Sequence, residues 1–175
     1  MTERELSGRE RELLESEIIS TRTDERGLIK FINPVFTRVT GYTKEDALGK
    51  PHNLIRHPDV PRAVYYLLWS QIKEKRDRFF AVTKNVCKNG DHYWTIGYFQ
   101  PEIGAEGETT GFRSTRHGLH EPTLKKEFDQ LYRQVREEEL RHPRPKQIEA
   151  GLEALNKWLR KKNYDDYESF ARRSL

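Results

Sequence analysis

The sequence predicts an α+β fold, in which a five-stranded antiparallel sheet carries short helices on one face and helices flank it at both ends. The first reason is the order in which strand-like and helical hydrophobic patterns occur along the chain. Two strand-like segments precede three helical segments, and three more strands follow. Aromatic, glycine and β-branched residues are concentrated between positions 18 and 117. The segments on either side are highly charged, which is typical of helices that face solvent.

The composition fits one domain of ordinary size with an appendage. The 175 residues are 34% hydrophobic and 34% charged, and the mean hydropathy is −0.95. We expect an amphipathic N-terminal helix over residues 1–17, a domain over 18–120 and a charged helical extension over 121–175. This extension has 24 charged residues among its 55, so we expect exposed helices there rather than a packed domain.

The first elements of the domain follow from turn and capping residues. Residues 18–32 predict a hairpin, with two strands joined by a turn at Thr23–Gly27. Asn33-Pro34 is a capping residue followed by a proline suited to the first helical position, and the helix that it opens ends at Gly41. A capping box predicts a second short helix over Thr43–Gly49.

A loop at Pro51–Pro61 contains three prolines and has no periodicity. The strongest helical pattern of the domain, Pro61–Ile72, begins with the last of these prolines. The three later strands, separated by turns at Asn89–Asp91 and 104–110, are predicted at Phe79–Cys87, Tyr93–Phe99 and Gly111–Thr115.

The extension predicts a helix over Pro122–Leu140, a break at 142–145 and a second helix that ends near Lys162, followed by one more amphipathic turn. Apolar stripes occur around Leu6–Leu14 and Ile148–Trp158. These stripes predict either contacts in a homodimer or with a signalling partner, or a cover for the exposed face of the sheet. Both interpretations remain open at this point.

Several functional classes are disfavoured by the sequence. Its apolar stretches are too short to span a membrane, so we expect no direct membrane insertion, and its start has no secretory apolar region. Its single cysteine, Cys87, fits a reducing cytoplasm, and a net charge of +4 is too small to indicate nucleic-acid binding. There is no P-loop, histidine-kinase segment, nucleophile elbow or metal-ligand spacing, so we expect neither an enzyme nor a metal site.

The loop Lys50–Pro61 concentrates two imidazoles, a guanidinium and a carboxylate between prolines. Together with Asn33-Pro34, Gly41-Tyr42 and the Lys88–Trp94 run, its His-Asn-x-x-Arg-His-Pro-Asp motif resembles PAS sensor domains over about residues 18–117. The two longer motifs are more narrowly similar to the FAD-binding PAS domains of bacterial aerotaxis receptors. The resemblance implies a cytoplasmic redox or oxygen sensor that binds FAD non-covalently and signals through its flanking helices.

The resemblance also implies a set of cofactor-binding residues, which are Asn33, His52, Arg56, His57, Asp59, Trp69, Phe79 and Asn85. An arginine suits the diphosphate, and an asparagine can pair with the imide edge of the isoalloxazine ring. The histidine at 57 can respond to flavin reduction, and the aspartate at 59 can orient it or bind the ribityl chain. The subgroup carries a tryptophan where this chain has Phe79-Phe80, and phenylalanine stacks on a ring without offering an indole N–H.

Simpler interpretations accompany these assignments. His57 can be a satisfied loop histidine, Arg56 can form a structural ion pair with Asp59, and Trp69 can be an ordinary core residue. Haem is the rival cofactor, and a cofactor-free dimerisation or docking module is the rival function. Nothing after residue 120 resembles a membrane span, a HAMP segment or a methyl-accepting hairpin, which leaves open a stand-alone sensor or a fragment of a longer protein.

Overall fold

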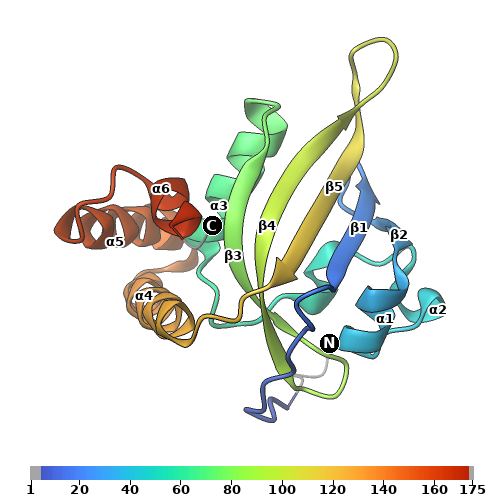
Figure 1. Cartoon of the computed structure of the whole chain (residues 1–175). Helices are drawn as coiled ribbons and strands as arrows, with labels where there is room; N and C mark the ends of the chain where they lie inside the picture. Colours follow the sequence, from blue (N-terminus) through green and yellow to red (C-terminus); the bar gives the residue numbers. More distant parts are fainter. Residues whose placement is uncertain (1–4, 174–175) are drawn as a thin grey trace.

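The computed structural model describes residues 5–173 and confirms the predicted sheet (Figure 1). Neighbouring strands all pair antiparallel, in the order β2-β1-β5-β4-β3. The strands are β1 (Ile18–Asp24), β2 (Ile29–Ile32), β3 (Phe79–Val86), β4 (His92–Ile103) and β5 (Thr109–Gly118). The last two extend several residues beyond their predicted ends, because they pair with each other past the end of β3.

The predicted helices lie near the positions that the turn and capping residues indicate, whereas two short 3-10 turns fall in the predicted loop Pro51–Pro61 and at the predicted break near 142–145. They are α1 (Pro34–Thr40), α2 (Lys44–Ala47), η1 (His52–Ile55), α3 (Arg62–Trp69), η2 (Ser70–Glu74), α4 (Pro122–Leu140), η3 (Arg144–Lys146), α5 (Gln147–Lys161) and α6 (Tyr167–Arg172). The Asn33 side chain caps α1, and Thr43 and Asp46 form the capping box of α2. The predicted helix Pro61–Ile72 is α3 continued by the π-helical turn η2.

The C-terminal helices, by which we mean α4, α5 and α6, lie beside the edge strand β3 (Figure 1). Side chains of α4 and α6 satisfy the outer backbone groups of this strand. The Tyr167 hydroxyl accepts from Val82 N at 3.2 Å and donates to Val82 O at 3.0 Å, and the Tyr132 hydroxyl also donates to Val82 O. Glu168 accepts from Phe80 N at 2.8 Å. A free strand edge is a template for aggregation, so these contacts protect it.

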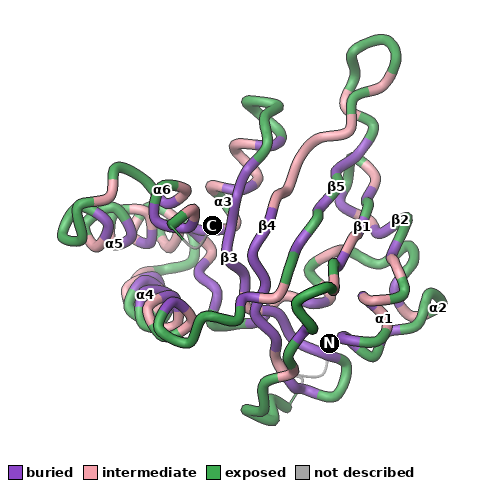
Figure 2. Tube along the Cα trace, in the orientation of Figure 1, coloured by how far each residue is buried: buried purple, intermediate pink, exposed green. Residues whose placement is uncertain are grey.

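The expectation that the C-terminal extension is exposed was wrong. Phe128, Leu155 and Phe170 are at most 1% exposed and belong to one core cluster with residues of β3 and α3. Charged residues occupy the outer faces of these helices, whereas their inner faces are buried (Figure 2). The apolar stripe of α5 packs on α3, α4 and α6, so it is used inside the molecule as a contact between helices. The sheet is contacted by the neighbouring helix, where Trp94 of β4 stacks on Tyr132 of α4.

The N-terminal helix was also a wrong prediction for residues 5–17, and residues 1–4 lie outside the described part. The segment runs beside the start of β4, where His92 N donates to Arg9 O at 2.9 Å and Arg11 N donates to His92 O at 2.7 Å. Leu13 is buried in the second core cluster. A helix this short is marginal by itself, so backbone pairing with β4 outweighs its amphipathic pattern. Between residues 5 and 173, no helix has the length and apolar character needed to cross a membrane.

Candidate functional site

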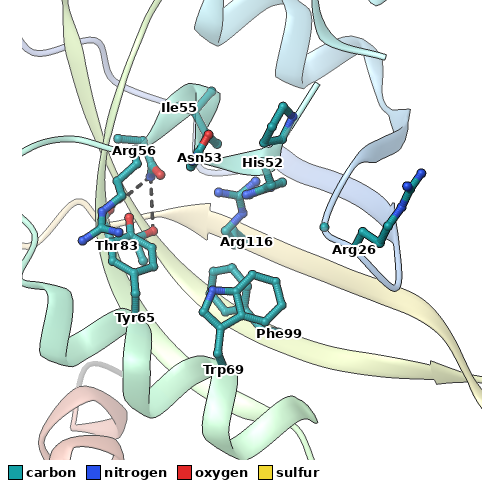
Figure 3. A pocket seen from close by; sticks show the side chains of 13 residues that line it. Arg26, His52, Asn53, Ile55, Arg56, Tyr65, Trp69, Thr83, Phe99 and Arg116 are labelled. Atoms are coloured by element: carbon teal, nitrogen blue, oxygen red, sulfur yellow. Dashed lines mark hydrogen bonds between the residues drawn. The ribbon is translucent and has the colours of Figure 1, made fainter. Parts of the chain in front are cut away.

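A cavity of about 220 Å³ lies between the sheet and α3, and side chains from the loop after α2 close it (Figure 3). Its lining comes from six separate parts of the chain. The lining residues are Arg26, Gly27, Pro51, His52, Asn53, Ile55, Arg56, Tyr65, Trp69, Thr83, Asn85, Phe99 and Arg116. Four of the predicted site residues, His52, Arg56, Trp69 and Asn85, are therefore brought together.

Aromatic side chains form one wall of the cavity. Tyr65 and Trp69 lie four residues apart on α3, so both point from the same face of the helix. Phe99 of β4 lies beside Trp69 in the view of Figure 3. The indole ring also packs edge-on against Phe112, with 5.3 Å between ring centroids. Trp69 thus packs against the core and lines the cavity at once, and the wall suits a flat aromatic ligand.

A polar patch on β3 lies within this apolar setting. Asn85 is 3% exposed, and its amide nitrogen donates to Thr95 Oγ1 at 3.1 Å and to Thr83 Oγ1 at 3.2 Å. Backbone pairing between Arg56 and Asn85 joins the loop to this strand. The amide is therefore held in a defined orientation, as recognition of a ligand edge requires.

Arg116 of β5 is the most unusual residue of the cavity. It is 1% exposed, and neither its Nε nor its Nη2 has a hydrogen-bond partner among the described residues. Burial lowers its pKa. In Figure 3 its side chain lies in the middle of the site, between His52 and Asn53 on one side and Trp69 and Phe99 on the other. The guanidinium carbon lies 5.7 Å from the centre of the Phe99 ring, but two of its nitrogens have no hydrogen-bond partner. Leaving buried nitrogens unpaired is costly, which indicates a site built for a group that the protein itself does not supply.

The charge of the cavity is one-sided. Arg26, Arg56 and Arg116 all line it, and none of the lining residues is acidic. The Arg56 guanidinium lies 3.9 Å from the centre of the Tyr65 ring, and Asp59 instead bonds Lys84 Nζ at 2.8 Å. The predicted alternative of an Arg56–Asp59 ion pair is therefore wrong. Three cations around an aromatic wall favour a planar ligand with negative charge.

His57 and Asp59 lie outside the cavity lining. The His57 ring is buried, its Nδ1 accepts from Asp59 N at 3.2 Å, and its centroid is 6.0 Å from that of His92. Lys84 bridges Asp59 to Asp129 of α4 at 3.0 Å. The interpretation of His57 as a satisfied loop histidine describes this geometry.

Asn33 and Phe79 are also remote from the cavity. The Asn33 carboxamide accepts from Phe36 N and Ser20 N and donates to Ile18 O, so its bonds fix the start of α1. The Phe79 ring stacks on Tyr167 of α6, with centroids 5.7 Å apart and planes 9° apart. Its side chain therefore joins the sheet to the C-terminal helices.

The sequence interpretation missed Arg116, Tyr65 and Phe99. A signal was present for the arginine, because Phe112, Ser114 and Arg116 alternate along β5 and are all buried. A charged residue at an inward position of a strand violates the usual pattern and marks a site. Tyr65 was visible at helical spacing from Trp69, but only the folded sheet shows that Phe99 faces the same space.

The histidines of this region predict a pH-dependent stability. Burial lowers the pKa of His57 to about 4, and burial together with the Arg116 charge lowers that of His52 to about 3. In the unfolded chain both rings become protonated as the pH falls through about 6.5, whereas in the folded protein they stay neutral. Unfolding therefore takes up protons below that pH, and the stability of the fold decreases as the pH falls. We expect the free energy of urea unfolding to drop by about 2 kcal/mol from pH 7 to pH 5, a value reduced from the full linkage because of solvent contact.

The control for this experiment is His117→Gln, because His117 is exposed. This variant should keep the pH dependence of the wild type, whereas His52→Gln should reduce it. A flat profile between pH 5 and 7 in the wild type would contradict the neutral state of both rings in the folded protein.

The architecture and the cavity define a class of protein. Residues 29–116 match the sequence family described as PAS fold, and the chain belongs to this family. Within residues 5–173, no group of three or more histidine, cysteine or acidic side chains is placed to hold a metal ion.

Two curated relatives are sensory or regulatory proteins by name. The chain is 36% identical over 104 residues to the aerotaxis receptor of Escherichia coli (strain K12), and the match covers 59% of this chain and 20% of the receptor. It is 28% identical over 86 residues to the nitrogen fixation regulatory protein of Klebsiella pneumoniae, covering 49% of this chain and 17% of that protein. The chain thus spans about a fifth of the length of these relatives.

Solved structures show the same fold. A PAS domain from Colwellia psychrerythraea superposes with a TM-score of 0.53 at 20% identity, covering 58% of this chain and 86% of that domain. An RNA-binding light-oxygen-voltage receptor gives a TM-score of 0.54 at 18% identity, covering 72% of this chain and 34% of the receptor chain. At these identities, the likeness concerns the fold alone.

Proposed function

We propose that this chain is a redox sensor that binds FAD non-covalently, with the isoalloxazine ring in the cavity beside α3, and that it signals the redox state of the flavin through its flanking helices. The observation that carries the proposal is Arg116, a buried guanidinium with unpartnered nitrogens in an aromatic cavity that has no acidic lining residue. A group that is flat, rich in acceptor atoms and able to carry negative charge supplies what this arginine lacks.

The residues present fit such a group. Tyr65, Trp69 and Phe99 supply the apolar slot, and the Asn85 amide oxygen can accept a hydrogen bond from a donor on the ring edge. A volume of about 220 Å³ is smaller than the roughly 300–1,000 Å³ of sites that enclose a whole drug-sized ligand. We expect the cavity to take only the ring system, so that a diphosphate would lie at the opening, where Arg26 is exposed and Arg56 is partly exposed.

The bound flavin would supply reversible electron acceptance. The task of the protein is then to hold the ring, exclude water and respond to its charge. Arg116 would compensate negative charge gained on reduction, and His52 beside it would remain neutral, because burial and the guanidinium both lower its pKa. The Asn85 amide would keep the ring edge against β3, the strand that the C-terminal helices cover.

The relatives support a role in sensing rather than catalysis. One is named as a receptor for aerotaxis and the other as a regulator of nitrogen fixation. In such a role the output is a change of conformation that a signalling partner or a second copy of the chain recognises. The flanking segments are the elements through which we expect this output.

Haem and a cofactor-free docking module are the competing proposals. His52 is the only histidine among the residues that line the cavity, and its Nε2 lies 3.0 Å from Thr21 Oγ1. This hydrogen bond occupies a nitrogen that a haem ligand would need. The unpartnered Arg116 disfavours a module without any ligand.

The absorption spectrum of the purified protein tests the proposal. We expect two broad flavin bands that bleach on addition of dithionite, either directly or after incubation with FAD. A Soret band would show that the cofactor is haem and not a flavin. A spectrum without cofactor bands even after addition of FAD would contradict the proposal and favour a docking module that binds no cofactor.

A further inference from the structure

Glu139 of α4 is a buried carboxylate that completes a helix far from it in the sequence. It is 0% exposed, its Oε1 accepts from Ala63 N at 2.8 Å and its Oε2 accepts from Arg62 N at 3.1 Å. These amides belong to the first turn of α3, whose N-cap residue, Pro61, provides no side-chain hydrogen bond. A negative charge at this place satisfies unpaired backbone donors and interacts favourably with the helix dipole.

The helix that Glu139 caps is a wall of the cavity. Tyr65 and Trp69 project from α3 into the site, and Arg56 stacks on the first of them. Arg136 Nη1 fixes the carboxylate from the α4 side at 2.9 Å. A displacement at the start of α3 therefore moves the aromatic wall and α4 together.

Helix α5 packs against the contact between Glu139 and the start of α3, which we call the junction. A Cβ atom added at Gly151 would lie 2.7 Å from Glu139 Oε1 and 2.9 Å from Ala63 Cβ, so only glycine fits between the two. Arg62 Nη1 also donates to Gln147 Oε1 at 3.1 Å, near the start of α5. Three helices thus meet at one buried carboxylate.

We propose that Glu139 is a positioning residue that couples the cofactor cavity to the C-terminal helices, so that the ligand state of the cavity is read at α5. The proposal rests on the proposed flavin function for the identity of the ligand. Coupling is reciprocal, so a change at the junction alters flavin affinity by the factor by which flavin alters the junction. No other polar side chain of the described residues caps the start of α3.

Two substitutions perturb the junction without touching the cavity. Glu139→Gln removes the charge but keeps one acceptor oxygen, and the matched control is Glu138→Gln, whose carboxylate pairs with Arg141 and His142 at the surface. Gly151→Ala adds the Cβ that meets the carboxylate. Alanine favours a helix interior over glycine, so any loosening by this variant must come from the junction. Its control is Asn156→Ala, which is exposed on α5.

The measurements are the FAD dissociation constant and amide hydrogen exchange, with and without saturating FAD, on the full chain. We expect Glu139→Gln and Gly151→Ala to weaken FAD binding by about tenfold and to speed exchange in α3, while both controls behave as wild type. FAD should slow exchange in α5 of the wild type and should not do so in Glu139→Gln. A purely structural role would lower stability without removing this flavin-dependent protection of α5.

The outcomes separate the inference from the proposed function. If the wild type binds FAD and both junction variants retain its affinity and its α5 protection, the coupling is overturned and the flavin function stands. If the wild type binds no FAD, the flavin function fails, and exchange across the junction without ligand decides the coupling. Faster exchange in α5 of Glu139→Gln and in α3 of Gly151→Ala than in their controls then supports it, because each change is transmitted to the other helix. Exchange equal to that of the controls at these two places overturns it.

Discussion

Replacing Arg116 with methionine should make the ligand-free protein more stable by about 1–3 kcal/mol, because it removes a buried charge that has two unpaired nitrogens and keeps most of the volume. Most substitutions of fully buried residues destabilise a protein, so a gain would be diagnostic. Urea unfolding of Arg116→Met and of the wild type, both freed of cofactor, measures this difference.

The same variant should lose at least about 30-fold in affinity for FAD, since a buried group that pairs with a ligand contributes roughly 2 kcal/mol or more to binding. Arg113→Met is the matched control, because Arg113 is exposed on the same strand, and its affinity and stability should stay near those of the wild type. An Arg116→Met protein that is less stable and binds FAD normally would show that the guanidinium serves the fold and not a ligand.

The second large effect concerns the C-terminal helices. Leu155→Ala should lower the free energy of unfolding by about 2–5 kcal/mol, because Leu155 of α5 is 0% exposed and truncation leaves a cavity in the core. Such a loss is a large part of the stability of a typical domain. Chemical denaturation followed by tryptophan fluorescence measures it, since Trp94 and Trp158 lie in or against the same core cluster.

Leu140→Ala is the matched control, because Leu140 is 61% exposed at the end of α4. This change should alter stability by no more than about 0.5 kcal/mol. Equal effects of the two substitutions would mean that α5 is not part of the core. The residues after 120 would then be an exposed extension, as the sequence predicts.

The sheet and its helices could be predicted because their signals are local. Asn89-Gly90-Asp91 marks a hairpin turn, Asn33-Pro34 marks a helix start, and Gly41 adopts the left-handed conformation at φ 75° that ends α1. The N-terminal helix failed for the opposite reason. Its alternating charges fit a helix, but the backbone of Arg9 and Arg11 pairs with His92, more than 80 residues away.

Half of the predicted site residues line the cavity, and half do not. The motif around His52–Asp59 identified the loop, yet adjacent residues of a loop face different ways. Arg56 lines the cavity, whereas His57 accepts from the backbone of Asp59 and Asp59 pairs with Lys84 of β3. Phe79 was expected at the cofactor because of its place in the motif. It packs on Tyr167 instead, because the C-terminal helices occupy that end of β3.

The sequence by itself determined the α+β order of elements and the turn positions, and its motif resemblance indicated the PAS family, because periodicity, capping and short motifs are properties of neighbouring residues. Only the tertiary structure decided that the charged tail is part of the core and that Arg116 is buried with two unpaired nitrogens. It also decided that Glu139 caps a helix 76 residues before it. Burial and hydrogen bonding between distant segments depend on which faces meet, and no local pattern specifies that.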